Sequence, residues 1–215
     1  MKYPRISINL AISADGKISS SGGIASGWTS DDDFARLKVL RQSCQALMVG
    51  RGTLEKDCMT LQAPQNPLRC VVSRSGNFEG SHPLFSTQGG PIHLLGTEAP
   101  PSTIAGTTAH QMSLPDFLGI LHTHHGVNQI HCEGGGQLIH HLAALDLIEE
   151  IHLTWAGHRV FGGENAPTLT GIPGNFLPHS RPFELTDIEP RNELGECFLS
   201  YRRRNSPAAP TQQAQ

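Results

Sequence analysis

The stretch "IHCEGGGQLIHHL", Ile130 to Leu142, places an acid and three consecutive glycines between a predicted strand and a predicted helix. Residues 128–133 are typical of a short buried strand, and "GQLIHHLAAL" is typical of a helix. Glycines at such a junction let the backbone approach a bound group, and the free N–H groups of the helix start favour an anion. The alternative is a tight turn without a ligand.

A second glycine turn, "VGRGT", follows the apolar segment 45–50. It has the same form, a strand that enters a tight loop where ligands bind in α/β sheets. Neither turn matches the G-x-G-x-x-G pattern of dinucleotide-binding units or the G-x-x-x-x-G-K-[ST] phosphate loop. The two turns therefore predict a phosphate-binding edge and argue against a standard Rossmann or P-loop protein.

Along the chain, predicted strands alternate with predicted helices, which indicates an α/β fold with a largely parallel sheet and helices on both faces. Ser30 before "DDD" predicts a capped helix start, and "ADGKISSSGGIASGWTS" before it is long enough for a functional loop. We expect one domain over 1–204, closed by an antiparallel hairpin, and a disordered tail over 205–215. The strands are predicted at 5–13, 45–50, 68–73, 91–96, 128–133, 147–157, 183–189 and 196–204, and the helices at 31–44, 114–124 and 136–145.

Composition excludes several classes of partner. The chain has 215 residues with 16 basic against 19 acidic side chains, which gives no field for general nucleic-acid binding. No apolar run reaches the roughly 20 residues of a membrane helix, and the N-terminus lacks a secretory pattern. The five cysteines form no C-x-x-C pair, so we expect free, mostly buried thiols and a cytoplasmic location.

Twelve histidines raise the question of a metal site, above all "HTHHG" and the pair His140 and His141. Neither cluster has helical i, i+4 spacing with a nearby acidic or cysteine ligand. The alternative for both clusters is a solvated helix end or flank. We therefore expect no metal.

Six stretches in order resemble the reductase domain of the bifunctional riboflavin-biosynthesis deaminase/reductase family and its stand-alone archaeal and fungal counterparts. They span roughly residues 5 to 163. The stretches are "SADGKI" (13–18), "GWTS" (27–30), "LRQSCQALMVGRGTLEKD" (40–57), "PLRCVVS" (67–73), "EGGGQL" (133–138) and "LDLIEEIHLTWAGHRVFGG" (145–163).

The resemblance implies a dihydrofolate-reductase-like three-layer fold, with a mixed, mostly parallel sheet of eight or nine strands between helices. It further implies a homodimer that binds NADPH and reduces the ribosyl group of a 5-amino-6-(5-phosphoribosylamino)pyrimidine to ribityl. The zinc-binding deaminase half is not among the matched stretches, so we expect neither zinc nor deamination.

The resemblance also assigns site residues. On the cofactor side the matching positions are Ala11, Trp28, Thr53, Asp57, Ser73, Gly134, Gly135, Gly136, Gln137 and Leu138. On the substrate side they are Ser26, Arg41, Leu61 and Glu133. The proton donor is not identified, with Glu133, Asp57, Lys17 and water as candidates, and Arg51 and Arg74 are candidates for the 2′-phosphate of NADPH.

Alternatives stay open for two of these residues. Arg41 can instead neutralise the C-terminal end of its helix, and Asp57 can cap the turn after Thr53. Where the family has an acidic, proline-containing segment that ends in a basic residue, this chain has "DCMTLQAP", with Pro64 at the basic position. That departure leaves three hypotheses: the pyrimidine-nucleotide reductase, a same-fold NADPH-dependent reductase of another heterocycle or pterin, or a non-catalytic cofactor-binding protein.

Overall fold

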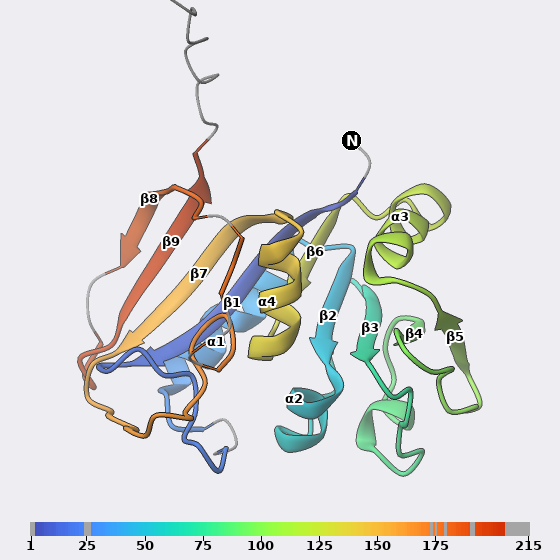
Figure 1. The fold of residues 1–215 in the computed structure, drawn as a ribbon, viewed down its shortest axis with the longest axis horizontal. Coiled ribbons are helices and arrows are strands. Elements are labelled where there is room, and N and C mark those ends of the chain that lie inside the picture. Colours follow the sequence, from blue (N-terminus) through green and yellow to red (C-terminus); the bar gives the residue numbers. More distant parts are fainter. Residues whose placement is uncertain are drawn as a thin grey trace, which may run out of the picture.

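The computed structural model describes residues 3–23, 27–172, 174, 176–178, 180–189 and 192–204. Its nine described strands form one sheet in the order β5-β4-β3-β2-β6-β1-β7-β9-β8 (Figure 1). The strands are β1 (Arg5–Ser13), β2 (Ala46–Gly50), β3 (Leu68–Ser73), β4 (Ile92–Gly96), β5 (Thr107–Gln111), β6 (Gln129–Cys132), β7 (Ile148–Ala156), β8 (Phe183–Glu189) and β9 (Cys197–Arg203). The helices are α1 (Asp31–Arg41), α2 (Arg51–Lys56), the 3-10 turn η1 (Pro83–Phe85), α3 (Leu114–His125) and α4 (Gly136–Ala144).

The sheet is mixed in the way the sequence predicts. The strands from β5 to β7 pair in parallel with their neighbours, whereas β9 runs antiparallel to both β7 and β8. The predicted mostly parallel sheet with a C-terminal antiparallel hairpin is therefore confirmed. The carboxyl ends of β1, β2, β3 and β6 consequently meet along one edge.

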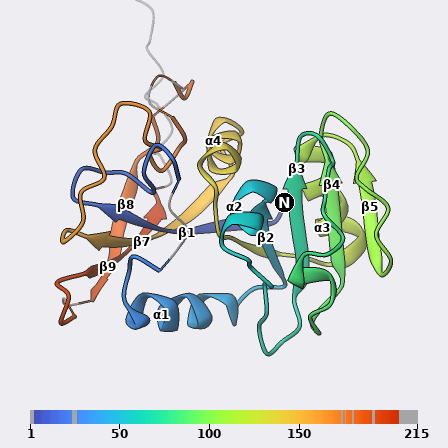
Figure 2. The same cartoon turned by 90° about the horizontal axis from the view of Figure 1, so that it is seen from below.

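Helices lie on both faces of the sheet, with α1 on one side and α4 on the other (Figure 2). Alternation along β2 separates the two cores: Ala46 and Met48 belong to the cluster that includes α3 and α4, and Leu47 and Val49 to the opposite cluster. All four side chains are fully buried. Burial on both faces explains why β2 is a continuous apolar run.

Helix α3 follows the amphipathic pattern. Leu114, Phe117, Leu118 and Leu121 are buried at helical spacing against the sheet. The Ser113 hydroxyl accepts a hydrogen bond from the Asp116 amide (3.2 Å), and Gly126 ends the helix in the left-handed conformation.

Helix α1 docks by polar contacts instead. Only Arg41 is buried among its residues. Arg36 donates to the Leu199 carbonyl (3.1 Å) and the Ser200 hydroxyl (3.0 Å), and Thr154 donates to Asp33 (2.5 Å). The predicted Ser30 cap is confirmed, because its hydroxyl accepts from the Asp33 amide (3.2 Å). Polar docking fixes the orientation of α1 and therefore the position of Arg41.

The structure corrects the predicted elements at several places. The helix predicted at 31–44 ends at Arg41, and residues 83–85 form the unpredicted 3-10 turn η1. Residues 51–56 form the short helix α2, where we expected only a tight loop, and 107–111 form the unpredicted edge strand β5. "TTAHQ" carries no apolar alternation, and its strand conformation depends on pairing with β4. The five cysteines are free, and Cys44, Cys70 and Cys132 are buried, as predicted. The predicted disordered tail lies outside the described residues.

Candidate functional site

A cleft of about 1300 Å³ opens at the carboxyl edge of the sheet. Leu10 and Ala11 of β1, Gly50 of β2, Ser73 of β3 and the Glu133–Leu138 segment line it. The two glycine turns meet there, because the Gly50 amide donates to the Gly134 carbonyl (2.9 Å). The prediction that both turns share one sheet edge is confirmed.

One side of the cleft, which we call the glycine wall, consists of Gly134–Leu138 together with Thr53. Gly135 caps α4 without a side chain, so the first N–H groups of the helix remain available to a ligand. Gly134 has φ +103°, a conformation that favours glycine. A Cβ on Gly135 would lie 2.5 Å from the Thr53 hydroxyl, and one on Gly136 would lie 2.9 Å from Gly171 Cα.

These observations test whether a dinucleotide fits. The glycine wall offers available amides and the positive end of the α4 dipole, which together suit a pyrophosphate. Its glycines pack so closely against Thr53 and Gly171 that a side chain at Gly135 or Gly136 would not fit. Ser73 lies at the end of β3 on the same cleft, where its hydroxyl accepts from the Gly76 amide (3.2 Å). The residues present therefore fit the pyrophosphate of a dinucleotide.

The other side, which we call the ion-pair wall, consists of Arg41, Glu133 and residues 56–60. Arg41 donates through Nε and Nη2 to the two carboxylate oxygens of Glu133, both at 2.6 Å, and through Nη1 to the Gln62 carbonyl (3.1 Å). Both side chains are almost fully buried. The family resemblance assigned each residue separately to the substrate, whereas the structure joins them in a bidentate ion pair. The paired carboxylate keeps further lone pairs that can accept from a ligand.

Most of the predicted site residues line the cleft, and two described ones, Leu61 and Lys17, do not. Ala11, Trp28, Thr53, Asp57, Ser73 and the 134–138 segment line it, as do Arg41 and Glu133. Leu61 is not among the lining residues, because its side chain is fully buried in the apolar core below. Lys17 is not among them either, and Ser26 lies outside the described residues. The Asp57 amide, rather than its side chain, bonds the Thr53 carbonyl at the end of α2.

The "SADGKI" motif has a visible structural role. The Asp15 carboxylate accepts hydrogen bonds from the Ser13 hydroxyl (2.5 Å) and from the amides of Phe161 (3.2 Å) and Gly162 (2.8 Å). These bonds lower the pKa of Asp15 to about 2. They tie the loop after β1 to the loop after β7. Trp28, which lines the cleft, packs edge-on against Phe161 at 4.9 Å between ring centroids, and this contact joins the same two loops a second time.

A polar layer supports the ion-pair wall from beneath. His131 lies two residues before Glu133, is fully buried and has its Nδ1 2.9 Å from the Ser7 hydroxyl. Burial, followed by the charges of His152, Arg41 and Arg36, lowers the pKa of His131 to about 3. The imidazole is therefore neutral beside Arg41 at physiological pH.

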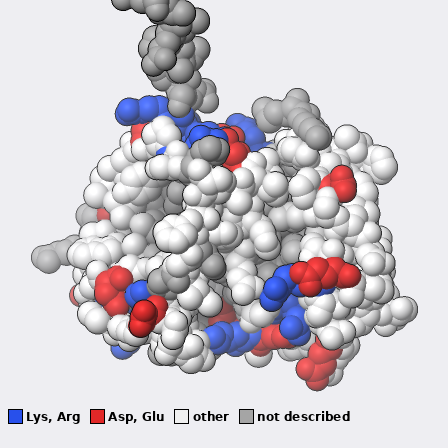
Figure 3. Space-filling view, viewed as in Figure 1, with Lys and Arg blue, Asp and Glu red and all other residues white. Residues whose placement is uncertain are grey.

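The described residues show neither a surface of one charge sign in Figure 3 nor a metal-binding cluster. On the face shown in Figure 3, basic and acidic residues lie in small groups of both signs. Among the described residues, no group of three or more His, Cys, Asp or Glu is arranged to hold a metal ion. No helix in the described part of the chain is long and apolar enough to cross a membrane.

Sequence reasoning missed several lining residues, among them Asn9, Lys56, Met59 and Asn165. Lys56 and Met59 lie in or beside the "LEKD" motif that drew attention to Asp57, so their position next to a motif was the available signal. Asn9 carried a weaker signal, as a polar residue that alternates with apolar ones along β1.

Comparison with known proteins identifies the family. Residues 4–191 match the model of the RibD C-terminal domain, and the chain belongs to that family. It is 27% identical to the 2,5-diamino-6-ribosylamino-4(3H)-pyrimidinone 5′-phosphate reductase of Archaeoglobus fulgidus, over 94% of this chain and 99% of that protein.

Solved structures agree on the fold. The structure of a diaminohydroxyphosphoribosylaminopyrimidine deaminase/5-amino-6-(5-phosphoribosylamino)uracil reductase from Thermotoga maritima superposes with a TM-score of 0.78 at 20% identity, over 94% of this chain. The match spans 57% of that longer chain. Dihydrofolate reductase from Enterococcus faecalis superposes with a TM-score of 0.56 at 15% identity, over 94% of this chain and 99% of that chain. The predicted dihydrofolate-reductase-like fold is thus confirmed.

Proposed function

We propose that this member of the RibD C-terminal domain family is an NADPH-dependent reductase of riboflavin biosynthesis. It would convert the ribosyl group of a 5-amino-6-(5-phosphoribosylamino)pyrimidine to ribityl. The observation that carries the proposal is one cleft with two unlike sides: a glycine wall suited to a pyrophosphate and a buried Arg41–Glu133 pair. The near full-length match to a named reductase supports the same conclusion.

The cofactor would lie along the glycine wall. Its pyrophosphate would accept hydrogen bonds from the amides at the start of α4, with Thr53 and Ser73 on either side. The bound nicotinamide would supply a hydride to C1′ of the ribose. We assign the 2′-phosphate of NADPH to Arg74, because Arg74 lines the cleft and Arg51 is already paired with Glu55 at 3.1 Å.

The substrate would lie against the ion-pair wall. Glu133, held by Arg41, would accept hydrogen bonds from N–H or O–H groups of the pyrimidine or ribose. Ring opening at C1′ needs a proton on the departing ring oxygen. Both Glu133 oxygens already accept from Arg41, and Lys17 is not on the cleft wall, so Asp57 and water remain as candidates. We assign to Asp57, which lines the cleft, the transfer of a proton that it takes up from water.

Two further proposals concern assembly and location. Leu185 and Ile188 on the outer strand β8 are about half exposed, and we propose that the chain forms a homodimer, to be tested by analytical ultracentrifugation. We also propose a cytoplasmic location, in keeping with five free cysteines.

Titration with NADPH followed by turnover tests the function. Purified full-length protein should bind NADPH, bind NADH more weakly, and oxidise NADPH when given the ribosylamino-pyrimidine phosphate, in its aminated or deaminated form. Binding of NADPH without turnover of either form would favour the second candidate, a same-fold reductase of another heterocycle. The altered segment 57–64 is the observation that keeps this candidate open. No nicotinamide binding would overturn both.

A further inference from the structure

We propose that Lys56 binds the 5′-phosphate of the substrate, an inference that rests on the proposed function. A phosphate dianion needs a cationic or amide-rich contact, and Pro64 stands where the resemblance leads one to expect a basic residue. Pro64 is exposed and does not line the cleft. Another residue of the cleft must therefore supply the charge.

Four cations line the described part of the cleft: Arg41, Arg51, Lys56 and Arg74. Arg41 is committed to Glu133 and the Gln62 carbonyl, and Arg51 pairs with Glu55. Arg74 follows β3, which β2 separates from β6 and its Glu133. Lys56 remains, and no carboxylate of the described residues forms an ion pair with it.

The topology puts the Lys56 ammonium over the substrate side. In the sheet, β2 and β1 flank β6, whose carboxyl end leads into Glu133. Lys56 ends the helix that follows β2, and Gly23 lies in the loop that follows β1. A Cβ built on Gly23 would lie 1.6 Å from Lys56 Nζ, so the ammonium lies directly against the Gly23 backbone. The side chain therefore spans the end of β6.

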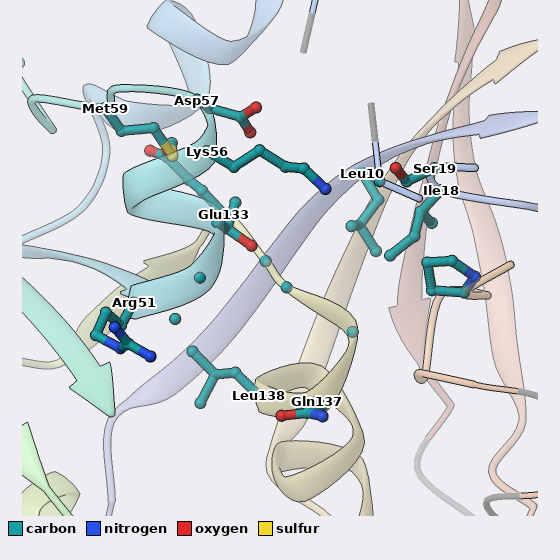
Figure 4. Close-up of a pocket in the computed structure, with 18 of the residues that line it drawn as sticks. Leu10, Ile18, Ser19, Arg51, Lys56, Asp57, Met59, Glu133, Gln137 and Leu138 are labelled. Carbon is teal, nitrogen blue, oxygen red and sulfur yellow. The ribbon is translucent and has the colours of Figure 1, made fainter. Parts of the chain in front are cut away.

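Figure 4 shows this arrangement. Lys56 extends from beside Asp57 and Met59 toward Leu10 and Ser19, and Glu133 lies below the Lys56 side chain in this view. The side chain is exposed, which leaves its ammonium able to turn toward a ligand. The ammonium of a flexible lysine can bind a phosphate as a point charge, whereas the nearby Arg41 guanidinium already donates to both Glu133 oxygens.

The test compares substrates with and without the phosphate. Lys56→Met should raise the KM of the 5′-phosphorylated substrate roughly 10- to 100-fold, the range of a lost charge-assisted hydrogen bond, with little change in kcat or in the Kd of NADPH. With the dephosphorylated substrate, parent and variant should have equal KM values. Lys56→Arg should restore most of the difference. Lys38→Met is the matched control, because Lys38 lies on α1 against the Phe34 ring at 4.3 Å and not on the cleft wall.

A binding measurement separates failure of this inference from failure of the proposed function. In the presence of saturating NADP⁺, ribose 5-phosphate should bind the parent protein, and Lys56→Met should weaken that binding while Lys38→Met does not. Equal binding to both variants, or an unchanged preference for the phosphorylated substrate in Lys56→Met, would overturn the role of Lys56. Lys56-dependent binding without turnover of the pyrimidine substrate would instead overturn the proposed reaction and leave a sugar-phosphate site.

Discussion

The glycine wall and the ion-pair wall of the cleft keep their shape by different means. The glycine wall is held by backbone: Gly50 donates to Gly134, and close approach to Thr53 leaves no space for a side chain at Gly135. The ion-pair wall is held by side chains that α1 and β6 bring together, Arg41 and Glu133. A wall made of backbone depends on small residues in one short segment, whereas a wall made of paired charges depends on partners far apart in sequence.

The largest effect should come from breaking the ion pair. Glu133→Ala leaves the Arg41 guanidinium buried with only the Gln62 carbonyl, which should cost about 3–5 kcal/mol of unfolding free energy. Arg41→Ala should cost a similar amount and raise the substrate KM more than the Kd of NADPH. The double variant should cost clearly less than the sum of both, as measured by denaturant titration.

The exposed pair Arg51–Glu55 on the same cleft is the control for this experiment. Both side chains are about one-third exposed, and Glu55→Ala should cost only about 0.3–0.5 kcal/mol. Additive losses in Arg41→Ala and Glu133→Ala would contradict the account of the ion-pair wall.

Acid should lower the free energy of unfolding, in part through the buried His131 beneath the ion-pair wall. Burial holds the pKa of His131 at about 3 and that of His93 at about 4, below the ordinary 6.5 of an unfolded histidine. Between pH 6.5 and 4 the unfolded chain therefore binds protons that the folded chain does not. Stability should fall with falling pH, by up to about 1.4 kcal/mol per pH unit for each histidine.

His131→Leu isolates the contribution from beneath the ion-pair wall. It should flatten the dependence of unfolding free energy on pH between 6.5 and 4, and His93 should account for part of the remaining slope. An unchanged slope in His131→Leu would show that this buried histidine does not titrate on unfolding as described.

A smaller effect should come from filling the glycine wall. Gly135→Ala puts a methyl group 2.5 Å from the Thr53 hydroxyl, and the adjustment should raise the Kd of NADPH about 10-fold, or about 1.4 kcal/mol. Gly80→Ala is the control, because its added Cβ would meet nothing within 4 Å. Titration of nicotinamide fluorescence measures both, and equal Kd values would place the cofactor elsewhere.

The smallest effect should come from the contact between Trp28 and Phe161. Trp28→Ala removes the edge-on contact with Phe161, worth about 0.5–1.5 kcal/mol beyond the burial of the ring. Binding of NADPH should weaken a few-fold, because the loops after β1 and β7 remain tied through Asp15. Stopped-flow binding should show a faster dissociation rate rather than a slower association rate.

The two walls also explain what could be predicted from the sequence. The glycine wall, β2 and α4 follow from local patterns: three consecutive glycines, a continuous apolar run and a helix start. The Arg41–Glu133 pair could not be predicted in this way, because it depends on the position of α1. Polar contacts fix that position, and they leave no periodic pattern in the sequence. Leu61 was assigned to the substrate by resemblance alone. Its burial in the apolar cluster that contains Leu47 and Val49 depends on the packing of the loop after α2. Lys56 stands next to Asp57 in "LEKD", but that position does not show where its ammonium lies, which depends on the crossing from α2 to Gly23.

Isotope transfer tests the central claim, that one cleft brings a nicotinamide and a ribosylamino-pyrimidine together for reduction. Full-length protein is incubated with NADPH deuterated at both C4 positions of the nicotinamide and with the 5′-phosphorylated substrate, and the product is analysed by mass spectrometry and NMR. The account predicts a ribityl product with one deuterium at C1′, formed as NADPH is oxidised. A product without deuterium at C1′, or NADPH that binds and stays unoxidised with this substrate, would contradict it.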